Sequence, residues 1–169
     1  YMYPLKNSKS SASRRLNRLT QVKDLRQKDL SYGILQENYL LSAIHKKYPN
    51  VQKTDQYCSV DYECDKFVIE LKSRRCNHNK YPTTMISKSK IDYMLDKGKS
   101  QTSKTCSKRG ICLFNFYDGL YEIEITPDVV NTFNCCFGGR HDRGRREYNI
   151  YYYIPIKMLK IFDIQKSQN

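Results

Sequence analysis

Two segments of the chain repeat apolar side chains at the spacing of a helix. The first is 29–47, where the pattern ends at Pro49, and the second is 83–98, where Gly98 ends it. A helix that packs on a core carries apolar residues every three to four positions along one face. We therefore predict one helix in each segment.

Other segments alternate or concentrate apolar residues over short runs, which is typical of strands. The strongest is 66–72, preceded by a hairpin tip at Asp65-Lys66. The pair Asp118-Gly119 between two apolar runs is the clearest hairpin turn in the chain. The predicted strands are 51–58, 59–64, 66–72, 111–117, 120–126 and 148–156, and a short helical segment at 157–162 closes the pattern.

The order of these elements predicts an α/β (α+β) fold with a central mixed sheet flanked by helices. Helix 83–98 lies between strands 66–72 and 111–117, and a crossover through a helix lays the two strands it joins side by side and parallel. The chain length suits one domain. We expect residues 1–28 to form a basic N-terminal arm and residues 29–169 the domain.

The arm itself allows two interpretations. Residues 1–20 carry lysines and arginines among serines and asparagines, with no acid, which favours a mobile segment. The spacing of Leu16, Leu19 and Val22 also fits a helix, so both interpretations stay open.

The whole chain is strongly basic, with 30 lysines and arginines against 17 acids and a net charge of +13. Such an excess favours a polyanionic partner, because neutralised phosphates release counterions. The plentiful lysine, tyrosine, asparagine and isoleucine would also follow from an AT-rich coding sequence. The charge is clustered, however, above all in the glycine- and arginine-rich segment 134–148, which we expect to be a flexible loop. We therefore predict nucleic acid, most of all DNA, as the partner.

The seven cysteines are odd in number and irregularly spaced, which favours free thiols in a reducing compartment. Two groups of cysteine and histidine, within 58–78 and 135–141, lack the paired knuckles of a structural zinc site. The first residues contain no apolar stretch long enough for a signal peptide, and no run reaches the length of a membrane span. We expect an intracellular protein of the cytoplasm or nucleus, in a host cell if the source is viral, with no membrane partner.

The stretch SVDYECDKFVIELKSR at 59–74 holds the candidate chemistry. Asp61 lies nine residues before Glu70, and Lys72 follows two residues later. Alternate side chains of a strand share a face, so Glu70 and Lys72 point the same way while the apolar residues between them enter a core. If the preceding strand ends or bends at Asp61, its carboxylate comes beside that of Glu70. The simpler alternative is an ion pair on a solvated strand face.

Asp55 is a second candidate for the first carboxylate. It lies 15 residues before Glu70, which is a long gap for one hairpin, and so we favour Asp61.

This arrangement resembles the PD-(D/E)XK nuclease superfamily and its restriction-endonuclease-like fold. Asp61, Glu70 and Lys72 carry the motif, Val60 stands where the motif often has a proline, and the order of elements matches over residues 30–162. A small basic domain of this kind is similar to Holliday-junction resolvases, to repair and recombination endonucleases and to viral endonucleases. The resemblance implies a homodimer as one arrangement of the subunits.

Hydrolysis of a phosphodiester needs an activated water and relief of negative charge, and Mg²⁺ or Mn²⁺ serves both with oxygen ligands. The predicted ligands are the carboxylates of Asp61 and Glu70 and the carbonyl of Leu71. Lys72 is predicted beside the attacking water or a phosphate oxygen. The resemblance also implies a glutamate from the first helix, and Glu37 lies at a compatible position.

Phosphate contacts are predicted at the second helix and in the arginine-rich loop. A helix that starts at Thr83 or Thr84 offers amides and hydroxyls to a phosphate, and lysines further along it can face solvent or the backbone. Arginines on a glycine-rich loop can follow a backbone or enter a groove. The predicted nucleic-acid-binding residues are Thr83, Thr84, Lys88, Lys90, Arg140, Arg143, Arg145 and Arg146.

These features predict a metal-dependent nuclease that hydrolyses phosphodiester bonds in DNA, in repair, recombination or junction resolution. The alternative is a catalytically silent protein of nuclease fold that binds nucleic acid or has a structural role in a larger assembly.

Overall fold

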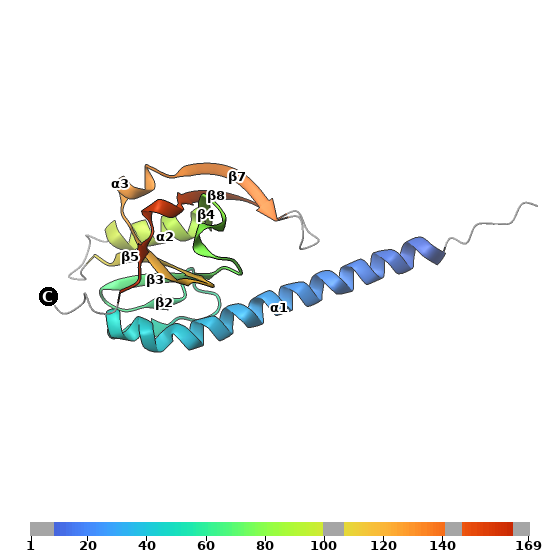
Figure 1. Ribbon diagram of the computed structural model, residues 1–169, viewed down its shortest axis with the longest axis horizontal. Helices are drawn as coiled ribbons and strands as arrows, with labels where there is room; N and C mark the ends of the chain where they lie inside the picture. Colours follow the sequence, from blue (N-terminus) through green and yellow to red (C-terminus); the bar gives the residue numbers. More distant parts are fainter. Residues whose placement is uncertain (1–8, 100–106, 141–146, 164–169) are drawn as a thin grey trace, which may run out of the picture.

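The computed structural model describes residues 9–99, 107–140 and 147–163. Two sheets and a long helix dominate this part of the chain (Figure 1). The first sheet has six strands in the order β1-β2-β3-β5-β6-β9, and the second has three in the order β4-β8-β7. This architecture confirms the predicted α/β (α+β) class with a central mixed sheet.

The elements follow one another along the chain in an order close to the predicted one. They are α1 (Lys9–Lys47), β1 (Gln52–Lys53), β2 (Tyr62–Glu63), β3 (Phe67–Ser73), the 3₁₀ helix η1 (His78–Lys80), β4 (Thr83–Ser87), α2 (Lys88–Lys99), β5 (Arg109–Phe116), β6 (Gly119–Ile125), α3 (Pro127–Val130), β7 (Asn134–Arg140), β8 (Glu147–Pro155), the 3₁₀ helix η2 (Ile156–Met158) and β9 (Lys160–Ile161).

Strand β3 lies at the centre of the six-stranded sheet. It is antiparallel to β2, with Tyr62 opposite Ile69, and parallel to β5, with Glu70 opposite Cys112. The predicted parallel neighbour is therefore confirmed, and β5 and β6 form the predicted hairpin. Gly119 follows its turn with φ of 154°, a value that glycine adopts without strain.

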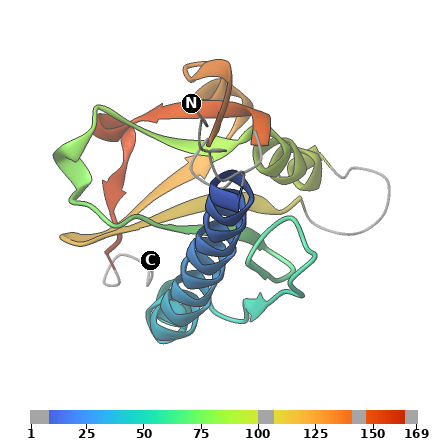
Figure 2. The same cartoon turned by 90° about the vertical axis from the view of Figure 1, so that its right-hand side faces the viewer.

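Both faces of β3 are covered. Ile69 and Leu71 pack with Leu40 and Ile44 of α1 in one core. Val68 on the opposite face belongs to a second core, which α2 and the three-stranded sheet complete. Figure 2 looks along α1 and shows the six-stranded sheet between the two helices. The face of β3 that carries Val68 and Glu70 is therefore covered and is not a solvated strand face.

Helix α1 begins at Lys9, so much of the predicted arm continues the helix, and no proline interrupts the chain between Pro4 and Pro49. The helix projects well beyond the two sheets (Figure 1). Its contact with the core comes from Leu40 and Ile44 near its end, whereas Ile34 and Leu35 are 44% and 63% exposed. No helix in the described ranges is long and apolar enough to cross a membrane.

Two predicted elements are wrong in part. The predicted helix over 83–98 begins at Lys88, because residues 83–87 form β4 and pair with β8, with Thr84 opposite Ile154. The predicted loop over 134–148 is a strand as far as Arg140, because β7 pairs with β8. The partner of β4 lies more than sixty residues away in sequence, and so a local pattern does not reveal it.

The predicted helical segment at 157–162 is also corrected. A single 3₁₀ turn, η2, is followed by β9, which pairs Ile161 with Tyr121 of β6.

Gly110 provides a test of the contact between α2 and β5. A Cβ at this position would lie 2.8 Å from Cβ of Met94, which is close to the α2 backbone and cannot swing away. We expect Gly110→Ala to lower the free energy of unfolding by about 1–3 kcal/mol, as overpacking of a core typically does. Urea denaturation followed by circular dichroism measures it.

Gly33→Ala is the matched control, since its added Cβ would lie 4.0 Å from the nearest atom, Oε1 of Glu37, and Gly33 is within a helix. It should leave the stability unchanged or raise it by up to about 1 kcal/mol. Equal urea midpoints for Gly110→Ala and the unmodified protein would contradict the close packing of α2 on β5.

Candidate active site

The β2–β3 hairpin brings the side chain of Asp61 to β3. The Asp61 amide donates to the carbonyl of Ile69 at 3.0 Å, which extends the strand pairing by one bond. The Asp61 carboxylate then accepts the Leu71 amide through Oδ2 at 2.7 Å. It therefore takes the place of a strand partner just before β2 begins, and the carboxylate is fixed at the Leu71 amide.

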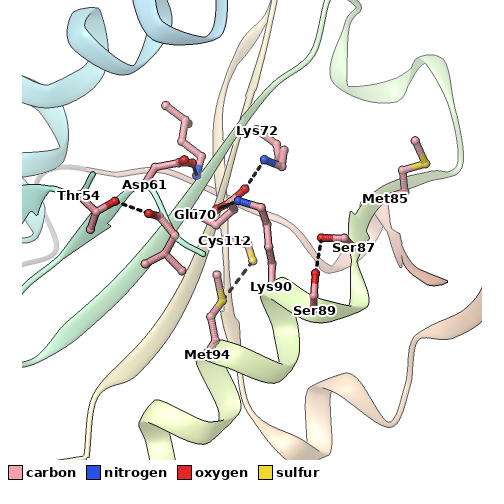
Figure 3. Close-up of polar contacts among 12 residues, drawn as sticks. Thr54, Asp61, Glu70, Lys72, Met85, Ser87, Ser89, Lys90, Met94 and Cys112 are labelled. Carbon is pink, nitrogen blue, oxygen red and sulfur yellow. Dashed lines mark hydrogen bonds and ion pairs between the residues drawn. The ribbon is translucent and has the colours of Figure 1, made fainter. Parts of the chain in front are cut away.

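Glu70 is wholly buried, with 0% of its side chain exposed. Lys72, two residues further along β3, forms an ion pair with Glu70 Oε1. Lys90, from the first turn of α2, approaches from the other side, with Nζ 2.6 Å from Glu70 Oε2. Figure 3 shows the two ammonium groups converging on the carboxylate from β3 and from α2.

The charges around Glu70 act in opposite directions. Burial raises the pKa of Glu70, and the negative charge of Asp61 raises it further, while Lys72 and Lys90 oppose both effects. Burial alone would lower the pKa of Lys72, but the carboxylates of Glu70 and Asp61 outweigh it and raise that pKa. Each charged group of the cluster thus depends on its neighbours, because a buried charge without a partner is strongly destabilising.

A cleft of about 610 Å³ lies over this cluster. Its walls come from α1, the end of β3, β4, the start of α2, and β8, and they are rich in polar side chains. Among the predicted site residues, those that line it are Glu37, Asp61, Leu71, Lys72 and Lys90.

Glu37 is placed on the wall of this cleft by α1. Its carboxylate forms an ion pair with Lys53 at 2.8 Å, and its backbone carbonyl accepts the hydroxyl of Tyr62 at 2.8 Å. The structure therefore brings Glu37 and Asp61 to one cleft, with the Glu37 carboxylate engaged by a lysine of β1.

The donor set fits a hard divalent cation. Glu70 Oε1 is buried and forms an ion pair with the Lys72 ammonium, so a cation at this oxygen would compete with that lysine. The amide and carbonyl of one strand residue point to the same edge, so the Leu71 carbonyl faces the edge where its amide meets Asp61. Mg²⁺ uses one or two carboxylates and keeps several waters. The described ranges hold no group of three or more His, Cys, Asp or Glu side chains suited to a metal.

The residues predicted to contact nucleic acid are dispersed. Thr83 and Thr84 belong to β4 and not to a helix start, so they offer no helix N-terminus to a phosphate. Thr84 is also buried. Lys88 pairs with Asp92 at 2.6 Å on the surface of α2 and does not line the cleft. Arg140 ends β7. The side chains of Arg140, Arg143, Arg145 and Arg146 lie outside the described residues.

Two residues of the cleft make contacts that the sequence did not predict. Lys90 was expected to face solvent or a phosphate but pairs with Glu70. Arg74 was not predicted, yet it lines the cleft and donates to the hydroxyl of Thr84 at 3.2 Å and to the carbonyl of Met85. Strand alternation from Glu70 through Lys72 would have placed Arg74 on the same face. No local signal marks Lys90.

Comparison with known proteins gives one family. The model of the family described as phage putative PDDEXK endonuclease matches residues 29–161, well over half of the chain. No curated protein matches it. The matched region contains the β2–β3 hairpin, α2 and both sheets, and so includes every residue of the buried cluster. The chain belongs to this family of PD-(D/E)XK endonucleases.

Proposed function

We propose that the protein is a metal-dependent endonuclease that hydrolyses phosphodiester bonds in DNA, with Asp61, Glu70 and Lys72 as its catalytic residues. One observation carries the proposal: a fully buried glutamate is held between two lysines and beside an aspartate, and these three neighbours line a polar cleft. An apolar side chain in place of a buried ion pair is often as stable or more so. Stability alone therefore gives no reason for this cluster.

The chain supplies both ligands and cations for the reaction. The carboxylates of Asp61 and Glu70 and the carbonyl of Leu71 would hold Mg²⁺ or Mn²⁺, which lowers the pKa of a bound water and offsets charge on the phosphate. Lys72 is 30% exposed on the side of the cleft, where its ammonium can stabilise the negative charge that grows on a phosphate oxygen. Glu37 on the cleft wall is a further candidate to orient water.

The charge distribution supports DNA as the substrate. The net charge is +13, and the projecting half of α1 carries Arg14, Arg15 and Arg18 in its sequence. Residues of α1 and β8 line opposite parts of the cleft, so a bound backbone would pass close to both. Repair, recombination and junction resolution are the processes we propose, with a homodimer cutting two strands.

Loss of cleavage tests the catalytic assignment. Lys72→Ala and Asp61→Asn should each reduce cleavage by about 100-fold or more in the presence of Mg²⁺ or Mn²⁺. The first removes a positive charge at the reacting phosphate, and the second removes the charge of a metal ligand. Linear, single-stranded, flapped and four-way DNA, with RNA beside them, should be compared on denaturing gels. The same panel identifies the preferred substrate.

Lys160→Ala, at an exposed position of β9 away from the cleft, is the matched control and should cleave at the normal rate. Cleavage that survives both Lys72→Ala and Asp61→Asn would contradict the assignment. Salt-sensitive binding of DNA without any cleavage by the unmodified protein would favour the silent nucleic-acid-binding alternative.

Metal affinity gives a test that does not depend on activity. The ammonium of Lys90 lies on Glu70 Oε2 and competes with a cation for that carboxylate. We expect Lys90→Met to bind Mn²⁺ more tightly than the unmodified protein and Glu70→Gln to lose binding, as measured by isothermal titration calorimetry.

Lys88→Met is the control on the same helix, since Lys88 pairs with Asp92 rather than Glu70. Its affinity for Mn²⁺ should not change. If Glu70→Gln binds Mn²⁺ as well as the unmodified protein, the metal lies elsewhere.

A further inference from the structure

A second cavity, of about 290 Å³, adjoins the proposed active-site cleft. Arg74 and Met85 line both, so the two spaces share a wall where β3 leads into β4. The lining of the second cavity is largely apolar and contains four rings, those of His78, Tyr81, Phe116 and Tyr153.

The walls of this cavity are held in place by contacts that need no ligand. The His78 ring stacks on Tyr121, with centroids 4.0 Å apart and an angle of 6° between the planes, and meets Phe116 edge-on at 5.5 Å. The His78 amide donates to the Asp118 carboxylate at 2.7 Å. Across the cavity, the Ile156 amide donates to the carbonyl of Pro82 at 3.0 Å. The cavity is therefore preformed, which favours binding because little ordering is required.

Polar lining residues set the cavity apart from an ordinary packing defect. Asn77, Thr83 and Thr84 line it beside the rings. The Arg74 guanidinium is fixed at the shared wall by Thr84 and Met85. A fitting occupant would thus be flat and mostly apolar, with hydrogen-bonding atoms on its edge.

The entrance carries an aromatic ring exposed to solvent. Tyr81 is 55% exposed, and the Lys80 ammonium lies 5.4 Å from its ring centroid. An exposed ring beside a cation is a suitable platform for a base whose phosphate is nearby, because bases stack on aromatic side chains irrespective of sequence. The volume lies just below the range of about 300–1,000 Å³ for small-molecule pockets, which favours a single base over a larger occupant.

We propose that this cavity binds one unstacked nucleobase of the DNA strand whose phosphate occupies the cleft. The inference rests on the proposed function and specifies its substrate class. A base within an intact duplex is stacked and paired and cannot enter, so the preferred substrate has an unpaired or readily extruded nucleotide next to the cut. Single strands, flaps and junctions meet this requirement, and regular duplex meets it least.

Binding of fluorescent DNA tests the proposal without cleavage. A set of single-stranded oligonucleotides, each with 2-aminopurine at a different position, is mixed with the full chain in EDTA. Entry of a base into the cavity should change the emission strongly at one position and weakly at the others. Tyr81→Ala should remove that response and weaken binding about tenfold, as the loss of one base–aromatic stack does.

Tyr81→Phe separates stacking from hydrogen bonding and should retain both the response and the affinity. Tyr57→Ala, which removes a tyrosine that is 90% exposed and lines neither space, is the matched control and should bind like the unmodified protein. Equal emission changes at all positions, an unaltered Tyr81→Ala variant, or no binding of single-stranded DNA would each overturn the proposal.

The outcomes distinguish this proposal from the nuclease function. Cleavage that depends on Lys72, without a position-specific change in emission, would support the nuclease function and contradict the base pocket. A change in emission that depends on Tyr81, without any cleavage, would support the base pocket and contradict the nuclease function, since the protein would then bind DNA but not cut it.

Discussion

The Glu70 carboxylate, buried between two lysines, is the constraint on which the rest of the site depends. A carboxylate removed from water needs cations at close range, and it receives one from its own strand and one from α2. Lys90 can reach Glu70 because α2 packs across the face of β3 on which the carboxylate lies. The cluster therefore joins the helix to the sheet electrostatically, in addition to the apolar contacts of Ile91 and Met94.

The same constraint explains the position of Asp61. Its carboxylate accepts a backbone amide, and its charge raises the pKa of Glu70. Two neighbouring carboxylates, one of them wholly buried, form an environment that a divalent cation relieves. The lysines hold the cluster together without one, and a cation must therefore compete with them.

The sequence indicates which side chains meet on β3 better than it indicates what surrounds them, because their contacts are local. Asp61, Glu70 and Lys72 all lie in one hairpin, where strand alternation and a short turn determine which side chains meet. The burial of Glu70 could not be predicted, since α2 and the second sheet cover it from distant parts of the chain. The segment 83–87 was assigned to a helix because its apolar spacing fits one, yet its pairing with β8, more than sixty residues later, makes it a strand. Helix α1 was divided into arm and helix because its charge changes there, although nothing in the backbone breaks it.

The residues proposed for the reaction are close together in sequence, whereas those proposed for substrate recognition come from distant parts of the chain. The groups assigned to the metal and the phosphate come from β3 and the residue before β2, with Lys90 added by α2. The walls that a nucleic acid would touch come from α1, β4, η1 and β8, and they meet β3 at Arg74. Arg74 bonds Thr84 and Met85 of β4 and lines both the cleft and the aromatic cavity, so β4 shapes the space for a substrate without contributing a charge to the buried cluster. Substrate choice in such a fold can therefore vary with the second sheet while the charge arrangement around Glu70 stays the same.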